Sequence, residues 1–172
     1  MTAAEFAQKH AGDSVEYVNG QVRPLNTGEA RHGLVCCTTA TRIAQFIEPR
    51  HLGNLFAGGT FTRVPTPTDP ERVYGPDVAF VASHELPDDD ILSTPPIVVE
   101  VMASSDTPAA LLDKVEDYLG AGVGVVVVID PATRAVAVHR AGAEQQTFGP
   151  DATLTLPDVL PGFAVPVADL FR

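Results

Sequence analysis

The sequence predicts one α/β domain in which a mixed β-sheet is flanked by helices, and three observations support this fold class. The chain has 172 residues, of which 45% are apolar and 19% charged, as expected for a globular domain with a hydrophobic core. Two almost wholly apolar runs, at residues 97–102 and 124–130, are typical of buried central strands. The segment between them has helical spacing, which predicts a right-handed unit of strand, crossover helix and parallel strand. We therefore expect a single domain spanning residues 1–172.

The N-terminal part predicts a short helix followed by a β-hairpin. Thr2 is a suitable N-cap for a helix that extends to His10, and Glu5 completes a capping box. In the next segment, Asn19-Gly20 is a two-residue turn whose tolerance of positive φ angles suits a type I′ hairpin. Alternation sorts the first strand of this hairpin onto two faces, Val15 with Tyr17 and Glu16 with Val18.

Residues 27–48 are expected to form the longest helix. Asn26 and Glu29 supply a capping pair at its start, and Pro49 followed by Gly53 ends it. The stripe that should face the sheet consists of residues at helical spacing, namely Leu34, Cys37, Thr41, Ala44 and Ile47 with Glu48.

The stretch that follows predicts short strands separated by turns. Apolar residues alternate loosely over residues 54–64, and Gly58-Gly59 indicates a tight turn or bulge between two strands. Residues 65–76 are expected to be a loop or a sheet edge, and residues 77–82 a strand. The loop at residues 84–96 contains three consecutive aspartates, which favour a solvated surface over a metal site: Asp88, Asp89 and Asp90.

The helix between the two apolar strands has signals at both ends. Thr107 is its expected N-cap and Pro108 its first residue, and Gly120 and Gly122 follow its end at Leu119. Its buried stripe is predicted to be Leu111, Leu112, Val115, Tyr118 and Leu119. Beyond the second apolar strand we expect three further strands and a final helical turn, at residues 135–140, 144–148, 152–156 and 167–171.

Net charge and hydropathy limit the classes of function. The formal net charge is −11, which argues against tight non-specific nucleic-acid binding, because that affinity comes from lysine and arginine. A small basic cleft on an acidic body is still compatible with this charge. No apolar run reaches the roughly 18–20 residues of a membrane helix. Residues 1–13 lack the basic start and apolar block of a signal peptide, so we expect a cytoplasmic protein.

The two cysteines, Cys36 and Cys37, are adjacent in the sequence. Neighbouring residues on a helix point about 100° apart, so the pair would make a poor disulfide. The sequence has no Cys-x-x-Cys motif or Cys/His spacing typical of a structural zinc site. Both residues are therefore expected to be small, buried apolar groups.

Glu100 is the unusual residue of the strand at 97–102, because valines flank it on both sides. Period-two geometry gives the strand two faces, Val98 with Glu100 and Met102, and Ile97 with Val99 and Val101. A carboxylate buried there is destabilising by about several kcal/mol unless it is paired, hydrogen-bonded or metal-bound. The pattern favours a functional carboxylate, and the alternative is an ion pair with an arginine or lysine.

Asp77 opens the neighbouring strand, where an aspartate taken alone is a common turn or strand-edge residue. Beside Glu100 it gains significance, because two carboxylates about 4 Å apart repel by roughly 4 kcal/mol at an effective dielectric of about 20. A shared cation relieves that repulsion, and oxygen ligands suit Mg²⁺ or Mn²⁺. Helical geometry places Lys114 at the edge of its buried stripe, from which its ammonium can reach over the sheet. In metal-assisted phosphodiester cleavage it would orient the attacking water or stabilise the phosphorane, and an ordinary boundary lysine is the alternative.

An ordered set of motifs in this chain resembles a known family. The set comprises Gly75-Pro76-Asp77, Glu100 within IVVEV, Lys114, Tyr118, Gly122-Val123 and Ile129-Asp130-Pro131, with the EYVNGQV hairpin and Arg31-His32 upstream. In this order the motifs resemble the putative restriction endonuclease family, also called the domain of unknown function 820 type, of the PD-(D/E)xK nuclease superfamily. The resemblance covers nearly the whole chain and implies a restriction-endonuclease-like fold.

The resemblance also implies roles for individual residues. Asp77 and Glu100 would hold a divalent metal ion, Mg²⁺ or Mn²⁺, with help from the Val101 carbonyl. The superfamily usually places its lysine two residues after the acid, where this chain has Met102, so Lys114 is the matching residue. Two further residues would support the site, Glu16 and His32, and for the second an ordinary surface histidine is the alternative.

The function predicted from these motifs is a magnesium-dependent DNA endonuclease that hydrolyses phosphodiester bonds. The alternative is a catalytically silent interaction or binding module that retains the nuclease fold, and the acidic composition favours it. An enzyme with a serine or cysteine nucleophile finds no support, because the sequence has no Gly-x-Ser-x-Gly motif and no Cys/His pairing signal. Glycine-rich phosphate loops are absent too. Because cutting two strands favours two sites, the endonuclease hypothesis includes a homodimer.

Overall fold

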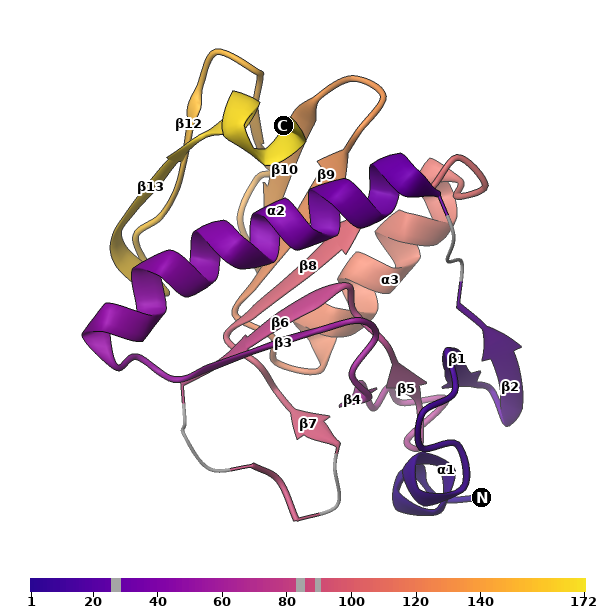
Figure 1. Cartoon of the computed structure of the whole chain (residues 1–172). Helices are drawn as coiled ribbons and strands as arrows, with labels where there is room; N and C mark the ends of the chain where they lie inside the picture. Colours follow the sequence, from indigo (N-terminus) through magenta and orange to yellow (C-terminus); the bar gives the residue numbers. More distant parts are fainter. Residues whose placement is uncertain (26–28, 83–85, 89–90) are drawn as a thin grey trace.

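The two apolar strands lie side by side in the central sheet of the computed structural model (Figure 1), which describes residues 1–25, 29–82, 86–88 and 91–172. This six-stranded sheet has the order β11-β10-β9-β8-β6-β3, and only its β8–β9 pair is parallel. The strands are β3 Asn54–Ala57, β6 Val78–Val81, β8 Ile97–Val101, β9 Val125–Asp130, β10 Ala135–His139 and β11 Gln146–Phe148. The predicted α/β class, with a mixed sheet and a crossover helix between parallel strands, is confirmed.

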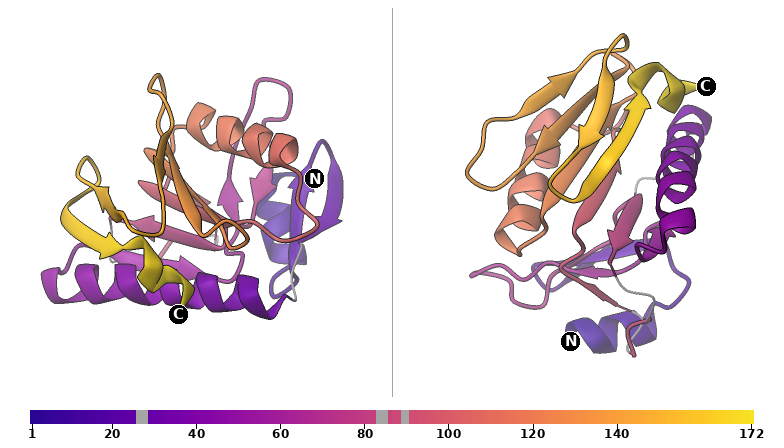
Figure 2. Two further views of the ribbon diagram at one scale, coloured as in Figure 1. Left: turned by 90° about the horizontal axis from the view of Figure 1, so that it is seen from above. Right: turned by 90° about the vertical axis from the view of Figure 1, so that its left-hand side faces the viewer.

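Two helices cover opposite faces of this sheet, as the view from above in Figure 2 shows. On one face α2, Ala30–Ile47, packs with the residues of β8 that point its way, and the short 3-10 helix η1, Glu48–Arg50, follows it. On the other face α3, Pro108–Gly120, packs Val115 and Tyr118 against Val98 of β8. The two faces predicted for β8 are thus confirmed, and Glu100 belongs to the α3 side.

A second, five-stranded sheet lies beside the N-terminal helix α1, Ala3–Lys9 (Figure 1). Its order is β2-β1-β5-β4-β7, and its strands are β1 Val15–Val18, β2 Gln21–Pro24, β4 Thr62–Arg63, β5 Val73–Tyr74 and β7 Leu92–Ser93. The capping box of α1 is confirmed, because Thr2 Oγ1 accepts from the Glu5 amide and the Glu5 carboxylate accepts from the Thr2 amide. The Asn19-Gly20 turn is confirmed as well, with φ angles of 52° and 76°.

The C-terminal segment forms a hairpin and a 3-10 helix on the α2 side of the central sheet. Its elements are β12 Thr153–Leu156, β13 Leu160–Pro166 and η2 Val167–Phe171. The predicted helical turn is η2, whereas β13 was not predicted as a strand. Apolar residues of this hairpin join the core under α2, and Arg42 of α2 pairs with Asp169 at 3.5 Å. Within the described ranges, none of the helices is both long enough and apolar enough to cross a bilayer.

The predicted buried stripe of α2 is wrong by about one residue of phase. The side chains that face the sheet are Val35, Thr39, Ile43 and Ile47, whereas Leu34, Cys37 and Thr41 are exposed. These four β-branched residues form a continuous i, i+4 row, and it is this row that packs on the sheet. The expectation that both cysteines are buried is also wrong, because Cys37 is exposed and Cys36 is half-buried, and both are free thiols.

Three smaller expectations differ from the structure or concern residues outside the described ranges. Leu112 was placed in the buried stripe of α3 but is 48% exposed. Glu29 is the N-cap of α2 without a side-chain capping bond, because its carboxylate accepts from the Ser104 amide at 2.9 Å instead. The predicted capping partner Asn26, residues 27 and 28 of the predicted helix, and Asp89 and Asp90 of the aspartate run lie outside the described residues.

Candidate active site

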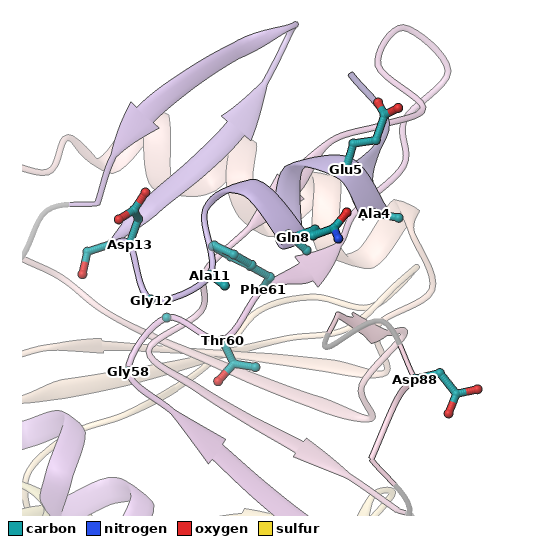
Figure 3. Close-up of a pocket in the computed structure, with 13 residues that line it drawn as sticks. Ala4, Glu5, Gln8, Ala11, Gly12, Asp13, Gly58, Thr60, Phe61 and Asp88 are labelled. Atoms are coloured by element: carbon teal, nitrogen blue, oxygen red, sulfur yellow. The ribbon is translucent and has the colours of Figure 1, made fainter.

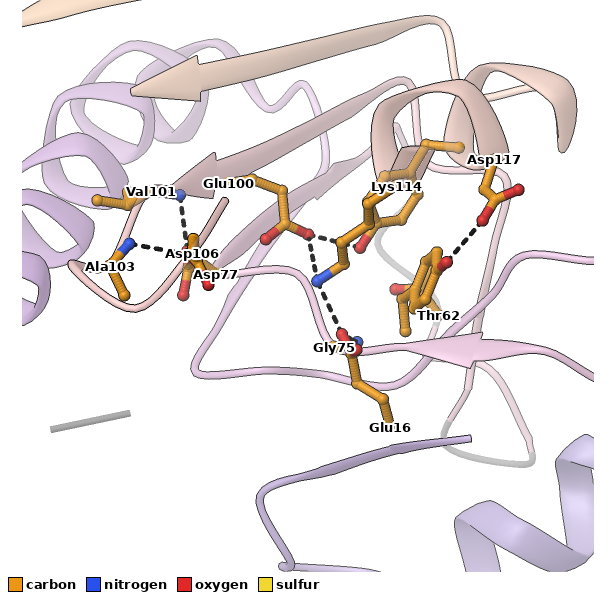
Figure 4. Close-up of polar contacts among 12 residues, drawn as sticks. Glu16, Thr62, Gly75, Asp77, Glu100, Val101, Ala103, Asp106, Lys114 and Asp117 are labelled. Atoms are coloured by element: carbon orange, nitrogen blue, oxygen red, sulfur yellow. Dashed lines mark hydrogen bonds and ion pairs between the residues drawn. The ribbon is translucent and has the colours of Figure 1, made fainter. Parts of the chain in front are cut away.

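The residues predicted for the site meet in one cavity at the end of β8 (Figure 4). This cavity has a volume of about 340 Å³ and lies between the β1–β2 hairpin, α2, β8 and α3. Every residue predicted for the site lines it: Glu16, His32, Asp77, Glu100, Val101 and Lys114. Segments far apart in the sequence therefore contribute to one pocket.

A larger cavity, of about 780 Å³, lies between α1 and residues 58–61 (Figure 3). Its carboxylates come from Glu5, Asp13 and Asp88, and Figure 3 shows that they point away from one another. Glu5 already caps α1, and Asp13 pairs with His10 at 2.9 Å. Because the described side chains of this cavity do not converge, we place the candidate site in the smaller one.

Asp77 lies directly before β6 and shares a side of the central sheet with Glu100. Val78 pairs with Val99 in the antiparallel β6–β8 ladder, so the next position places Asp77 opposite Glu100. The Asp77 carboxylate is oriented from both sides: its Oδ2 accepts from the Val101 amide at 2.8 Å and lies 3.3 Å from His32 Nε2. The two carboxylates predicted to share a cation thus face the same cavity.

Glu100 is buried, with 6% of its surface exposed, in a strand that is otherwise wholly apolar. Its Oε1 accepts a hydrogen bond from Tyr118 Oη at 2.7 Å and lies 3.0 Å from Lys114 Nζ. Burial raises the pKa of Glu100 to about 7, and the charges of Asp77 and Glu16 add to this rise while Lys114 opposes it. The ion pair considered as an alternative for Glu100 therefore exists, and it is made with a residue of the predicted site.

Lys114 is the cation at the centre of the cavity (Figure 4). Its Nζ lies 2.7 Å from Glu16 Oε1, 3.0 Å from Glu100 Oε1 and 5.0 Å from the centre of the Tyr74 ring. Burial alone would lower the pKa of Lys114, but the charges of Glu100 and Glu16 raise it above its ordinary value. The side chain is therefore a fixed ammonium group shared by two carboxylates.

Glu16 is held in the site by the main chain as well as by Lys114. Its Oε1 accepts from the Gly75 amide at 3.1 Å. Gly75 has no room for a side chain, because a Cβ there would lie 2.9 Å from the Gly59 carbonyl oxygen. The glycine before Pro76 thus allows the Gly58-Gly59 turn to pack closely against the segment whose amide binds Glu16.

His32 lies in the first turn of α2 and carries a proton at neutral pH. The hydrogen bond to Asp77 and a contact with Cys36 raise the pKa of His32 to about 10. Its ring therefore adds a positive charge next to Asp77. Its side chain contacts Asp77, a residue of the candidate site, and its supporting role stays a prediction.

Sequence reasoning missed the buried network that attaches α3 to the five-stranded sheet. Arg72 is 8% exposed, and its Nε lies 3.1 Å from Asp69 Oδ2. Its guanidinium also contacts Asp117 of α3, which accepts from Tyr74 Oη at 2.6 Å. The buried stripe predicted for α3 does not include Asp117. The available signal was an arginine directly before the apolar pair of β5, since such a position demands a carboxylate partner.

The chemistry of the cavity suits a hard divalent cation. Asp77 and Glu100 present carboxylate oxygens from adjacent strands, and the raised pKa of Glu100 shows that its charge is under-compensated even beside Lys114. Oxygen ligands are those that Mg²⁺ and Mn²⁺ prefer. The residues present therefore fit such an ion.

Comparisons with known proteins bear on the family and the fold of the chain. The family model described as "Putative restriction endonuclease", Uma2, matches residues 3–168. The crystal structure of a "putative nuclease belonging to DUF820" from Anabaena variabilis is similar over 99% of this chain and 97% of that one, with a TM-score of 0.82 and 18% sequence identity. At that identity the likeness shows the fold. No curated protein matches the chain.

Proposed function

The chain belongs to the Uma2 family of putative restriction endonucleases, and we propose that it is a divalent-metal-dependent DNA endonuclease that hydrolyses phosphodiester bonds. The observation that carries this proposal is the convergence of two carboxylates and one ammonium in a single cavity. These groups belong to Asp77, Glu100 and Lys114. Such a set is what metal-assisted hydrolysis of a phosphodiester requires.

Asp77 and Glu100 would hold Mg²⁺ or Mn²⁺ in this site. The Val101 amide already donates a hydrogen bond to the Asp77 carboxylate. The Val101 carbonyl is the predicted third ligand of the metal ion. When bound, the metal ion would supply an activated water and offset negative charge on the phosphate. Tyr118 holds Glu100 in place by its hydroxyl group, so the carboxylate needs little reorganisation to serve as a ligand.

Lys114 would act on the scissile phosphate. Because its ammonium lies 3.0 Å from Glu100 Oε1, any group bound beside that carboxylate is within reach of a hydrogen bond from Nζ. The charge that develops on a phosphorane oxygen is stabilised by such a fixed donor in a partly dry cavity. Glu16 restrains the lysine from the other side, which makes Glu16 a positioning residue.

The acidic surface of the protein requires that DNA be attracted locally. The net charge of −11 opposes general binding to a polyanion. Arg23 of β2 is exposed and lines the cavity, where His32 and Lys114 add two further cations. We propose that these three groups, with the bound metal ion, provide the local positive potential. Cleavage of both strands would need two such sites, which favours a homodimer.

Calorimetric titration with Mg²⁺ and Mn²⁺ tests the proposal at its first step. Wild type should bind one ion per chain, and Glu100→Gln should weaken binding by at least about tenfold because it removes a charged ligand. Glu116→Gln is the matched control, because Glu116 is an exposed glutamate of α3. If wild type gives no heat at millimolar metal, the nuclease proposal is wrong and the chain is a silent binding module. A plasmid-nicking assay then tests Lys114→Ala, which should lose activity while it still binds metal.

A further inference from the structure

A second group of potential metal ligands lies beside the proposed catalytic carboxylates. His32 and Cys36 are one turn apart on α2, and the side chain of Asp77 reaches them from the start of β6. One donor atom from each of the three residues can be chosen so that all lie within 4.8 Å of one another. This group offers nitrogen, sulfur and oxygen, whereas Asp77 and Glu100 offer oxygen alone.

The distances within this group suit a small tetrahedral ion. His32 Nε2 lies 3.3 Å from Asp77 Oδ2, and Cys36 Sγ lies 3.5 Å from His32 Nδ1 and 3.9 Å from its Nε2. A zinc ion with bonds of about 2.0 Å to nitrogen and oxygen and about 2.3 Å to sulfur separates its ligands by about 3.3–3.6 Å. The pair formed by His32 Nε2 and Asp77 Oδ2 matches this separation, whereas Cys36 Sγ, 3.9 Å from Nε2, has to move closer to complete the site.

We propose that His32, Cys36 and Asp77 bind a thiophilic transition-metal ion such as Zn²⁺, at a site that shares Asp77 with the Mg²⁺ site. Thiolate and imidazole ligands select Zn²⁺ and Co²⁺ over Mg²⁺, so the two sites differ in the metal they take. Binding replaces the hydrogen bonds of the group by metal bonds, and the thiol proton and the imidazolium proton leave to solvent. Three protein ligands leave a fourth position for water.

The shared carboxylate links the two sites. Two dications that share one carboxylate lie close together and repel each other, so an ion held by the thiolate disfavours a second ion beside Glu100. Provided that the proposed nuclease function holds, Zn²⁺ at this site lowers the affinity for Mg²⁺ and inhibits cleavage. The binding of the thiophilic ion itself is independent of that function.

Titration with Co²⁺, followed by absorption spectroscopy, tests the site. Cobalt bound to a thiolate gives a sulfur-to-metal charge-transfer band in the near ultraviolet, and a tetrahedral ion gives intense visible bands. We expect both bands in wild type, saturating at one ion per chain and reversed by added Zn²⁺. Loss of an outer-shell partner alone weakens metal binding by about 10–100-fold, so Cys36→Ser should weaken it by at least about 100-fold and abolish the charge-transfer band.

The chain provides a matched control and a way to separate the two proposals. Cys37→Ser removes the adjacent, exposed thiol and should leave both bands unchanged. Glu100→Gln should also leave them unchanged, although it weakens Mg²⁺ binding. A wild-type protein without the charge-transfer band overturns the proposal, as does a Cys36→Ser protein that keeps it or a Cys37→Ser protein that loses it. None of these outcomes depends on whether the protein cleaves DNA.

Discussion

Replacing Lys114 with methionine keeps most of the length of the side chain and removes its charge from the cavity. The ammonium lies 2.7 Å from Glu16 Oε1 and 3.0 Å from Glu100 Oε1, so the variant leaves two carboxylates without this cation. Removing one partner of a buried ion pair destabilises a protein by about 3–5 kcal/mol. Glu100 can relieve part of this loss by taking up a proton, because its pKa is already raised to about 7. We therefore expect a loss near the lower limit, about 3 kcal/mol at about pH 8.

Urea and thermal denaturation in EDTA measure this loss. For a domain of this size, 1 kcal/mol shifts the melting temperature by about 2–4 °C, so the Lys114→Met protein should melt about 6–12 °C below wild type. At about pH 5 the difference should shrink, because Glu100 is then protonated in both proteins. Lys9→Met is the matched control, since Lys9 is the other lysine of the chain and is exposed at the end of α1. If Lys114→Met loses no more stability than this control at both pH values, the lysine does not hold the carboxylates and the charge argument fails.

Three further predictions concern buried charge. The raised pKa of Glu100 means that the native protein holds this proton more tightly than the unfolded chain, so wild type loses stability as the pH rises from about 4.5 to about 7. In urea denaturation, the free energy of unfolding of Glu100→Gln should rise by about 3 kcal/mol relative to that of wild type across that window, and the difference should stay constant above it. Arg72→Met leaves Asp69 and Asp117 without their cation and should lower the free energy of unfolding by about 3 kcal/mol, and a change below about 1 kcal/mol would contradict the assigned network. Burial lowers the pKa of His139, so below about pH 6.5 the unfolded chain takes up a proton that the native protein does not. The melting temperature of wild type should therefore fall faster on acidification than that of His139→Gln. Parallel curves of melting temperature against pH for the two proteins would refute this.

The elements that could be predicted from the sequence are those whose signals are local. The capping box of α1 and the Asn19-Gly20 turn depend on residues within three positions of each other, and both are confirmed. The unit β8–α3–β9 was predictable because long apolar runs and an N-cap with proline leave few alternatives. Glu100 and Lys114 belong to this unit, whereas Asp77 reaches them from the start of β6, which pairs with β8.

The features that escaped prediction depend on tertiary contacts. β4, β5 and β7 are two residues long, and a strand of that length has no periodicity to detect. The face of α2 was misassigned because apolar residues occur around much of this helix, so only the shape of the sheet selects the row that contains Val35. Cys36 was missed for a related reason: its spacing of four residues from His32 becomes a ligand spacing only when Asp77 approaches from another element.

The energetics of the site indicate that its buried charges serve a chemical role and not the stability of the fold. Replacing a buried ion pair by apolar residues of similar size is often neutral or stabilising by about 1–4 kcal/mol. A valine at position 100 would continue the apolar run of β8, and an apolar residue at position 114 would extend the buried stripe of α3. Folding alone therefore gives no reason for Glu100, whose pKa shows that Lys114 and Tyr118 offset its burial only in part. A group that the fold stabilises incompletely is one that a bound cation can stabilise further, and this links the geometry of the cavity to the proposed binding of metal.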